Sequence, residues 1–462
     1  MLFNSYVFIL IFLPVVVIGY YMLGLYSRRG AQIWLLLASL VFYSYNRPSY
    51  LLIIVSSIVF NYALTRIMNR CDKDAYRKLL LVIGLAFNVG LIGYYKYFNF
   101  IKWNINHFLD LDLFINTIVL PLGISFYTIQ QISFVIDAYK RENADYSFLE
   151  YALYVSFFPQ LVAGPIVYHS EFVPQLHEKI NVNYENLTRG LIWFSLGLSK
   201  KVFIADRLGR AVEWGYTDIS RLTSLEAWLI ILSYTFQIYF DFSGYSDMAC
   251  GIGLMFNIKL PQNFNSPYKA LSIRDFWKRW HMTLTRFLTK YIYIPLGGSR
   301  CSARRIAFNT MVVFAVSGIW HGANYTFILW GIIHGILMLI DRFAGDIWKK
   351  VPVAIRWSLN FAIVSLLWAL FRADGVRQWI SLLGRIFSFD SALISSEFLG
   401  CFDSYLPWWI LLLAALLICL IPENNYNREI TVSRRFAILG AVLMVLSLFT
   451  LNRTSIFLYF NF

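Results

Sequence analysis

The chain has 462 residues, of which 58% are hydrophobic, 18% aromatic and only 14% charged. Soluble domains carry roughly 45–50% apolar and about 25% charged residues, so this composition argues against a water-soluble enzyme and against a disordered or fibrous chain. One membrane-spanning helix needs about 20 apolar residues, and the apolar content suffices for roughly a dozen. The composition therefore predicts an all-α, polytopic membrane protein with about 11–13 membrane helices, some of them short or re-entrant.

The net charge is +14, from 40 Lys and Arg against 26 Asp and Glu. The basic residues lie at the ends of apolar runs, where the positive-inside rule places them, so we interpret the charge as an orientation signal and expect no nucleic-acid binding. The five cysteines form no Cys-x-x-Cys pair, which disfavours a disulfide framework and a zinc knuckle.

Apolar runs follow one another along the whole chain without a linker or repeat, so we expect a single membrane domain over 1–462. The first run has no basic segment before it and is followed at once by further runs, which indicates a membrane helix rather than a cleaved signal. The runs lie near 2–23, 31–46, 49–65, 79–100, 115–136, 150–168, 188–205, 226–256, 306–320, 323–341, 357–371, 405–421 and 436–452.

The charges of the loops predict how the protein is oriented in the membrane. Basic residues at 28–29, 66–78 and 140–141 fall in alternate loops, which places these loops in the cytoplasm and the N-terminus outside. The segment 169–187 is then expected to face outward. Two later basic segments, near 349–356 and 428–435, suggest further cytoplasmic loops, and with both of them the C-terminus is expected outside. The run at 226–256 is too long for one span and too short for two, and Asp241 and Gly244 interrupt it. We expect a broken or re-entrant helix there.

Residues 259–305 contain ten Lys and Arg but one acid, Asp275. At 100° per residue, a helix near 276–291 presents one apolar arc and an opposite cationic side, the pattern of a helix lying in the membrane interface. The cationic side could anchor lipid headgroups, or bind the phosphates of an anionic cytoplasmic donor, and the two are compatible. Its candidate donor-binding residues are Arg279, Arg286 and Lys290.

His321 lies between two apolar runs, in the segment Gly318–Asn324. An ionisable side chain inside a membrane is costly unless it faces a cavity, so His321 is a candidate functional residue; the alternative is a histidine hydrogen-bonded within the bundle. His334 is 13 residues further on, about 220° around a continuous helix, and no carboxylate accompanies either histidine at ligand spacing. We expect no metal site.

As a set, several motifs resemble those of the bacterial membrane-bound O-acyltransferase (MBOAT) family, in the branch that O-acetylates alginate or peptidoglycan. The resemblance covers nearly the whole chain. The motifs are PLGISFYTIQ at 121–130, FFPQLVAGPI at 157–166, YFDFSGYSD at 239–247, NFNSPY at 263–268, DFWKRWH at 275–281, YIYIPLGG at 291–298 and WHG at 320–322.

The resemblance implies a ring of membrane helices around a central funnel in a bacterial inner membrane. It places His321 as the catalytic histidine and His281 as a second histidine of the signature. The donor would be a cytoplasmic thioester, acetyl-coenzyme A or an acyl carrier, and the acceptor an extracytoplasmic sugar hydroxyl. A histidine with an ordinary pKa near 6.5 can take the hydroxyl proton. Asn324, Trp320 or a backbone N–H could stabilise the oxyanion.

The C-terminal tail, 453–462, ends in the aromatic segment FLYFNF. Such a tail can be an interfacial aromatic belt. It also resembles the ending that carries an acyl-accepting tyrosine in this branch, which makes Tyr459 a candidate relay that hands the acyl group to an extracytoplasmic partner with a serine nucleophile. In D-alanylation systems this ending sits on a separate peptide, so its fusion here favours O-acetylation.

Other functions stay open at this point. They are D-alanylation-type transfer to teichoic acid, acylation of a protein or lipid on the cytoplasmic side, and transport of an anionic solute. No inverted repeat of the kind that many transporters carry is visible.

Overall fold

The computed structural model describes residues 1–111, 116–143, 145–389, 393–401, 407–422, 424, 433–451 and 457–458. Within these ranges the regular elements are helices, and no strand occurs. Some helices are long and apolar enough to cross a membrane: Val7–Tyr26, Tyr50–Arg70, Asp74–Leu109, Tyr325–Phe343 and Val353–Arg372. The shorter Trp408–Leu420 is also apolar. The prediction of an all-α membrane protein is confirmed.

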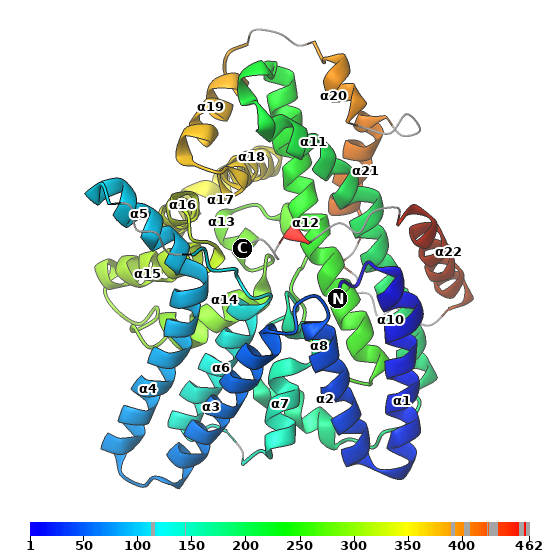
Figure 1. Ribbon diagram of the computed structural model, residues 1–462. Helices are drawn as coiled ribbons and strands as arrows, with labels where there is room; N and C mark the ends of the chain where they lie inside the picture. The colour runs from blue at the N-terminus through cyan, green and yellow to red at the C-terminus, as the bar shows by residue number, and fades with distance from the viewer. Residues whose placement is uncertain are drawn as a thin grey trace. The chain divides into compact units, whose positions relative to one another are not determined.

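The described residues form two compact units, each built from separate stretches of the chain. Figure 1 labels their helices. Unit 1 contains 1–196, 245–261 and the described part of 432–461, and unit 2 contains 197–244 and the described part of 262–431. Helices α10 (Tyr184–Ser199) and α12 (Ser224–Met255) each contribute residues to both units. The chain therefore passes from one unit to the other within each of these two helices.

Unit 1 is built from long helices joined by short turns, with π-helical turns at η1 and η2 and a 3₁₀ turn at η3. Its elements are η1 (Val7–Phe12), α1 (Leu13–Tyr26), α2 (Arg28–Ser44), α3 (Tyr50–Arg70), α4 (Asp74–Ile92), η2 (Gly93–Tyr97), α5 (Phe98–Leu109), α6 (Ile124–Tyr139), α7 (Phe148–Ser156), α8 (Phe158–Leu161), α9 (His169–Phe172), η3 (Val173–His177) and α22 (Arg434–Thr450).

Unit 2 holds both histidine motifs of the sequence analysis. Its elements are η4 (Lys200–Ala205), α11 (Asp206–Thr217), η5 (Ile219–Arg221), η6 (Pro267–Lys269), α13 (Ile273–Trp277), α14 (Met282–Leu288), η7 (Thr289–Tyr293), α15 (Ala303–His321), α16 (Tyr325–Phe343), α17 (Gly345–Lys350), α18 (Val353–Arg372), α19 (Val376–Ile386), α20 (Ser396–Gly400) and α21 (Trp408–Leu420).

The apolar run at 150–168 folds back on itself inside unit 1. The Tyr146 hydroxyl before it lies 3.1 Å from Nδ1 of His169 after it, so the segment enters and leaves at one end of the unit. Gln32, near the start of α2, donates a 2.9 Å bond to the Leu176 carbonyl at that same end. The expectation that 169–187 faces away from the basic loops is therefore wrong, because α7 and α8 form a re-entrant hairpin rather than a span.

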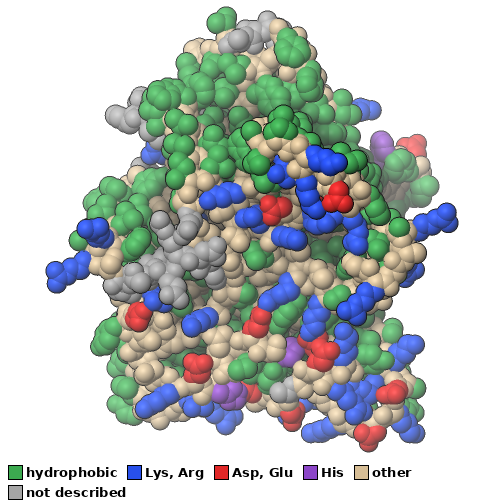
Figure 2. Space-filling view, turned by 180° about the vertical axis from the view of Figure 1, so that it is seen from behind, with side chains coloured by type: hydrophobic (Ala, Val, Ile, Leu, Met, Phe, Trp, Pro, Cys, Tyr) green, Lys and Arg blue, Asp and Glu red, His purple; other side chains and the backbone are tan. Residues whose placement is uncertain are grey.

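Charged side chains gather at this end of unit 1. Figure 2 shows Lys and Arg, with acidic residues among them, along the lower edge of one face, and the α1–α2 and α3–α4 turns lie at the lower edge in Figure 1. The Arg66 guanidinium contacts the Asp145 carboxylate, which joins the α3 end to the segment before α7. The basic loops thus meet at one end, as the charge pattern predicts.

Helix α12 is continuous over its 32 residues, so the predicted break at Asp241 and Gly244 does not occur. The Asp241 carboxylate accepts a 2.5 Å bond from the Lys201 ammonium, and both side chains are buried. A Cβ at Gly244 would lie 2.7 Å from the Gly197 carbonyl, so this glycine serves the close approach of α12 to the end of α10. Neither residue needs a helix break.

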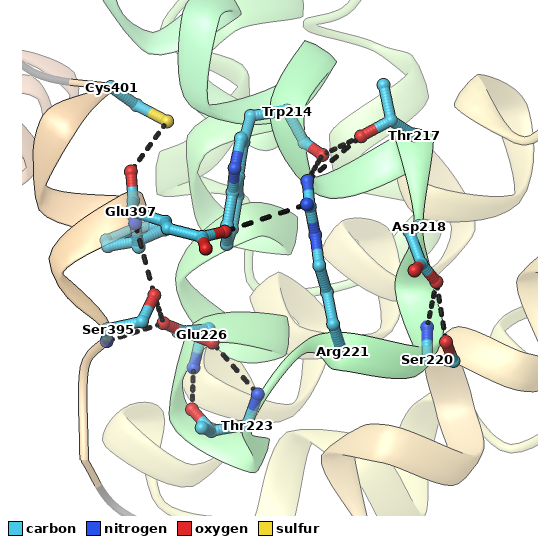
Figure 3. Close-up of polar contacts among 11 residues, drawn as sticks. Trp214, Thr217, Asp218, Ser220, Arg221, Thr223, Glu226, Ser395, Glu397 and Cys401 are labelled. Carbon is cyan, nitrogen blue, oxygen red and sulfur yellow. Dashed lines mark hydrogen bonds and ion pairs between the residues drawn. The ribbon is translucent and has the colours of Figure 1, made fainter.

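Polar contacts bind the connection between α11 and α12 to α20 within unit 2 (Figure 3). The Arg221 guanidinium lies 4.5 Å from the Trp214 ring centroid and 3.6 Å from the Glu397 carboxylate. The Glu226 carboxylate accepts bonds from the backbone N–H and the hydroxyl of Ser395, at 2.8 and 2.6 Å. These contacts fix the first turn of α12.

Candidate active site

Helices α15 and α16 form a tight antiparallel pair that ends at the WHG motif. A Cβ at Gly318 would lie 2.4 Å from the Phe327 carbonyl, and one at Gly331 would lie 2.4 Å from the Phe314 carbonyl. Small residues at such an interface let two backbones approach closely. The approach brings Trp330 of α16 beside His321, the last residue of α15.

His321 is buried, with 2% of its surface exposed, and its tautomer is defined by the backbone. Nδ1 lies 2.6 Å from the Ser317 carbonyl oxygen, four residues earlier in α15. Because a carbonyl only accepts, Nδ1 carries the proton and Nε2 of the neutral ring keeps its lone pair. This is the arrangement that a general base requires.

Aromatic rings enclose His321 on several sides. The centroid of its imidazole lies 4.9 Å from that of Trp320, 5.1 Å from Trp330 and 5.4 Å from Phe371. The Trp330 side chain is itself fully buried. Such a wall excludes water and strengthens electrostatic interactions inside it.

His281 lies close to the same motif. Its ring centroid is 5.9 Å from that of Trp320 and 4.9 Å from that of Phe242, and its side chain is fully buried. Its Nδ1 lies 3.3 Å from Oδ1 of Asn263, which also accepts a 2.7 Å bond from the Thr283 hydroxyl. The structure thus brings both predicted histidines into contact with the same side chain, that of Trp320.

The backbone at His281 is left-handed, with φ 44° and ψ 53°. A residue other than glycine in this region is uncommon and strained, and such residues gather at functional sites. The left-handed turn also divides the predicted helix near 276–291 into α13 and α14, followed by the π-helical turn η7. A single amphipathic helix therefore does not form, because the chain turns where His281 is inserted into the interior.

The three predicted donor-binding residues have separate surroundings. Arg279 donates from Nε to the Asp275 carboxylate at 2.8 Å, and the Lys290 ammonium lies 5.0 Å from the Tyr291 ring centroid. Arg286 is half-buried in α14. Since α13 and α14 are not one helix, the three do not share one helical face, and their role as donor contacts stays a prediction.

A cavity of about 230 Å³ lies beside the site within unit 2. Its walls are mainly apolar, from α13, α14, α15 and α16, and they carry two guanidinium groups, those of Arg274 and Arg342. Ser317, whose carbonyl holds the His321 ring, is one of its lining residues. Sequence reasoning missed both arginines, because their convergence depends on how α13 packs against α16.

Two of the proposed oxyanion donors can be located. Asn324 caps α16 with its side-chain oxygen, which accepts from Thr326 N–H at 3.1 Å, and its amide donates to the Asp374 carbonyl at 2.8 Å. It therefore has a structural role at the helix start. Trp320 lies against His321 and His281, as described above.

Tyr459 and the rest of 459–462 lie outside the described residues. Phe457, two residues earlier, is buried in unit 1 with its ring centroid 4.9 Å from that of Tyr245. Tyr245 in turn stacks on Phe3 at 4.8 Å. The last described residues thus lie near the start of the chain.

The residues described here show no group of three or more His, Cys, Asp or Glu side chains placed to hold a metal ion. The candidate site consists of histidine and tryptophan side chains, with a cavity next to it.

Comparison with known proteins decides the family. Residues 110–372 match the family model described as MBOAT, membrane-bound O-acyltransferase family. The chain belongs to the membrane-bound O-acyltransferase family. It is accordingly a membrane-embedded O-acyltransferase, and the family resemblance drawn from its motifs is confirmed.

Among the relatives of this MBOAT protein are enzymes named for polysaccharide O-acetylation. It is 45% identical to the peptidoglycan O-acetyltransferase of Helicobacter pylori over 83% of this chain and 79% of the relative. It is 37% identical to the probable alginate O-acetylase AlgI of Pseudomonas aeruginosa, over 86% and 76%. The teichoic acid D-alanyltransferase of Bacillus subtilis is 28% identical over 53% and 65%.

Proposed function

We propose that this O-acyltransferase takes an acetyl group from a cytoplasmic thioester and passes it across the membrane for O-acetylation of an extracytoplasmic polysaccharide, peptidoglycan or alginate. The names of the most similar relatives support the substrate class. The observation that carries the chemistry is the 2.6 Å contact between Nδ1 of His321 and the Ser317 carbonyl, since it leaves Nε2 as a base.

The reaction follows from the state of the His321 ring. A hydroxyl is a weak nucleophile at neutral pH, and Nε2 takes its proton as the oxygen attacks the thioester carbonyl. The C–S bond then breaks, and the leaving thiolate recovers the proton from His321. His281 acts by positioning, because its ring packs on Trp320 and its Nδ1 lies against Asn263.

The cavity supports a route for the donor. An acyl thioester of acetyl-coenzyme A or of an acyl carrier has a long, thin arm with a phosphate at its far end. The apolar walls of the cavity suit such an arm, and Arg274 or Arg342 suits a phosphate. Arg279, Arg286 and Lys290 remain further candidates for the anionic part of the donor.

Tyr459 is the proposed acceptor of the acetyl group on the extracytoplasmic side of the membrane. An aryl ester of tyrosine is a reactive acyl donor because phenolate is a good leaving group. A partner protein with a serine nucleophile would then collect the acetyl group outside the membrane. Phe457, two residues before Tyr459, is buried against Tyr245 in unit 1. With the basic loops in the cytoplasm, both chain termini lie outside a bacterial inner membrane.

His321→Ala tests the proposal in the purified, full-length protein. We expect release of thiol from acetyl-coenzyme A, and an acetyl mass increment on the C-terminal peptide, to be abolished while expression and thermal melting stay normal. His107→Ala replaces an exposed histidine of α5 and serves as the matched control. Acetyl transfer by His321→Ala at the parent rate would remove the general base.

Tyr459→Phe tests the relay separately, because it keeps the ring and removes only the hydroxyl. The variant should be stable but deliver no acetyl group to the polysaccharide, and its C-terminal peptide should carry no acetyl mass. A D-alanyl carrier offered in place of acetyl-coenzyme A distinguishes the D-alanylation alternative. Uptake of an anionic solute without thioester cleavage would favour a transporter instead.

A further inference from the structure

Two N–H groups beside His321 are buried without a hydrogen-bond partner among the described residues. They are Nε1 of Trp330 and Nε2 of His334, both on α16. The Trp330 side chain is 0% exposed and the His334 side chain 1% exposed. Buried polar groups in proteins are nearly always paired, so two neighbouring exceptions require an explanation.

The His334 ring carries its proton on Nε2. Nδ1 lies 3.2 Å from Nε1 of Trp277, and an indole nitrogen is only a donor. Nδ1 is therefore the acceptor in this bond, and the neutral ring is protonated at Nε2. The bond also fixes the orientation of the imidazole, since Trp277 is itself held in α13 as a buried side chain.

The two groups lie near each other and near the base. Residues 330 and 334 are one turn apart on the same face of α16, and their ring centroids are 4.7 Å apart. The Trp330 centroid is 5.1 Å from that of His321. Trp277, which holds His334, and Ser317, which holds His321, both line the neighbouring cavity. Two donors and one base are thus grouped next to residues that line the cavity.

We propose that Trp330 Nε1–H and His334 Nε2–H bind the carbonyl oxygen of the acyl thioester and stabilise the oxyanion that forms on it. The inference rests on the proposed function and assigns the oxyanion donors, which the sequence left open. The group that completes these two hydrogen bonds is a thioester carbonyl, a neutral acceptor that becomes an anion only during the reaction.

The acceptor hydroxyl oxygen forms a bond to the carbonyl carbon, and its proton goes to Nε2 of His321. The π electron pair moves to the carbonyl oxygen, which becomes the oxyanion held by the two donors. When the pair returns, the C–S bond breaks, and the thiolate takes the proton from His321. In a site that excludes water, fixed N–H donors stabilise the oxyanion more than they stabilise the neutral carbonyl.

Asn324 suits this role less well than these two groups do. Its amide oxygen caps α16 and its amide nitrogen donates to the Asp374 carbonyl, so both of its polar atoms already have partners. Trp330 and His334 have donors to offer without giving up a bond.

Three variants separate the donors from the packing. Trp330→Phe keeps an aromatic ring and deletes its N–H. His334→Asn keeps an acceptor for Trp277 at the place of Nδ1 and deletes the Nε2–H, whereas His334→Gln presents an amide N–H at the place of Nε2. Trp379→Phe is the control, because its indole N–H already donates to the Leu366 carbonyl at 3.1 Å.

The measurement is thiol release from acetyl-coenzyme A by the full chain, together with acetyl incorporation. We expect Trp330→Phe and His334→Asn each to lower kcat by about 10²–10³-fold with little change in KM, the usual effect of losing one oxyanion donor. His334→Gln should recover part of the rate, and Trp379→Phe should retain it.

A second readout does not depend on turnover. The ketone analogue acetonyl-coenzyme A, labelled with ¹³C at the carbonyl, should show a C=O stretch shifted to lower frequency when bound to the parent protein. The shift should shrink in Trp330→Phe and in His334→Asn. Parent-like kcat and an unchanged stretch in both variants would overturn the inference, and would indicate that a water molecule satisfies the two donors. If only the oxyanion donors are misassigned, His321→Ala still abolishes transfer; if His321→Ala transfers normally, the proposed function itself fails.

Discussion

Arg77 shows how one residue can hold a membrane domain together. It is 2% exposed, and its guanidinium donates to the Met68 carbonyl at 2.7 Å, the Ala138 carbonyl at 2.8 Å and the Tyr139 carbonyl at 2.7 Å. These carbonyls belong to the last turns of α3 and α6. A cation at two helix C-terminal ends also complements the partial negative charge of each helix dipole.

Arg77→Met should therefore destabilise unit 1 strongly. The methionine keeps much of the volume but leaves buried carbonyls without their donor, at a cost of about 3 kcal/mol in the free energy of unfolding. Thermal melting of the detergent-solubilised protein measures the loss. The neighbouring exposed Lys78→Met removes the same charge and is the control. Equal melting temperatures for the two variants would contradict the assigned role of Arg77.

The sequence identifies the two histidines of the site but not their surroundings. His321 and His281 are recognisable from their motifs, and the two lie around Trp320 as catalytic and positioning candidates. The tautomer of His321 follows from its contact with the Ser317 carbonyl, and at His281 a left-handed backbone accompanies burial of the side chain against Phe242. The His334–Trp277 bond joins residues 57 positions apart, and no local pattern announces it.

Helix α12 contains one side of a buried ion pair inside unit 2. Lys201, in the π-helical turn η4, contacts Asp241 at 2.5 Å and Asp206 at 2.9 Å. Asp241 is buried, whereas 24% of the Asp206 side chain is exposed. The lysine therefore offsets the negative charge that Asp241 brings into a continuous, buried helix.

The ion pair predicts the order of stability of three variants. Lys201→Met leaves Asp241 charged and buried without that cation, and should cost about 3–5 kcal/mol. Asp241→Asn should cost less, because Lys201 keeps Asp206. The double variant Lys201→Met/Asp241→Asn should be more stable than Lys201→Met alone. Melting temperatures of the three proteins give the order, and a double variant that melts below both single ones would show that the pair is not the unit of stability.

Apolar runs in the sequence predict some helices closely and others poorly. Apolar runs such as 323–341 and 357–371 correspond closely to α16 and α18, because long apolar segments have few alternatives. The runs at 150–168 and 226–256 have a similar composition, but tertiary contacts determine their paths. His169 meets Tyr146 and Asp137 in the first, and Lys201 meets Asp241 in the second.

The hairpin at 150–168 changes the number of times that the chain crosses the membrane. A span at 150–168 would put 169–187 on the side opposite to the basic loops, whereas the folded-back chain returns it to their side. Gln32 binds the Leu176 carbonyl, and a Cβ at Gly24 would lie 2.5 Å from the Ile180 side chain, so both contacts tie this segment to the α1–α2 turn.

Sided labelling of single cysteines in membrane vesicles tests this arrangement. In a background with the five native cysteines replaced by alanine, Asp72→Cys and Lys179→Cys are both exposed and should react with an impermeant maleimide from the same side, the cytoplasmic one by the positive-inside rule. Arg47→Cys, exposed at the other end of α2 and α3, should react only from the opposite side. Labelling of Lys179→Cys together with Arg47→Cys would mean that 150–168 crosses the membrane, and the route of the acyl group would have to be redrawn around one more span.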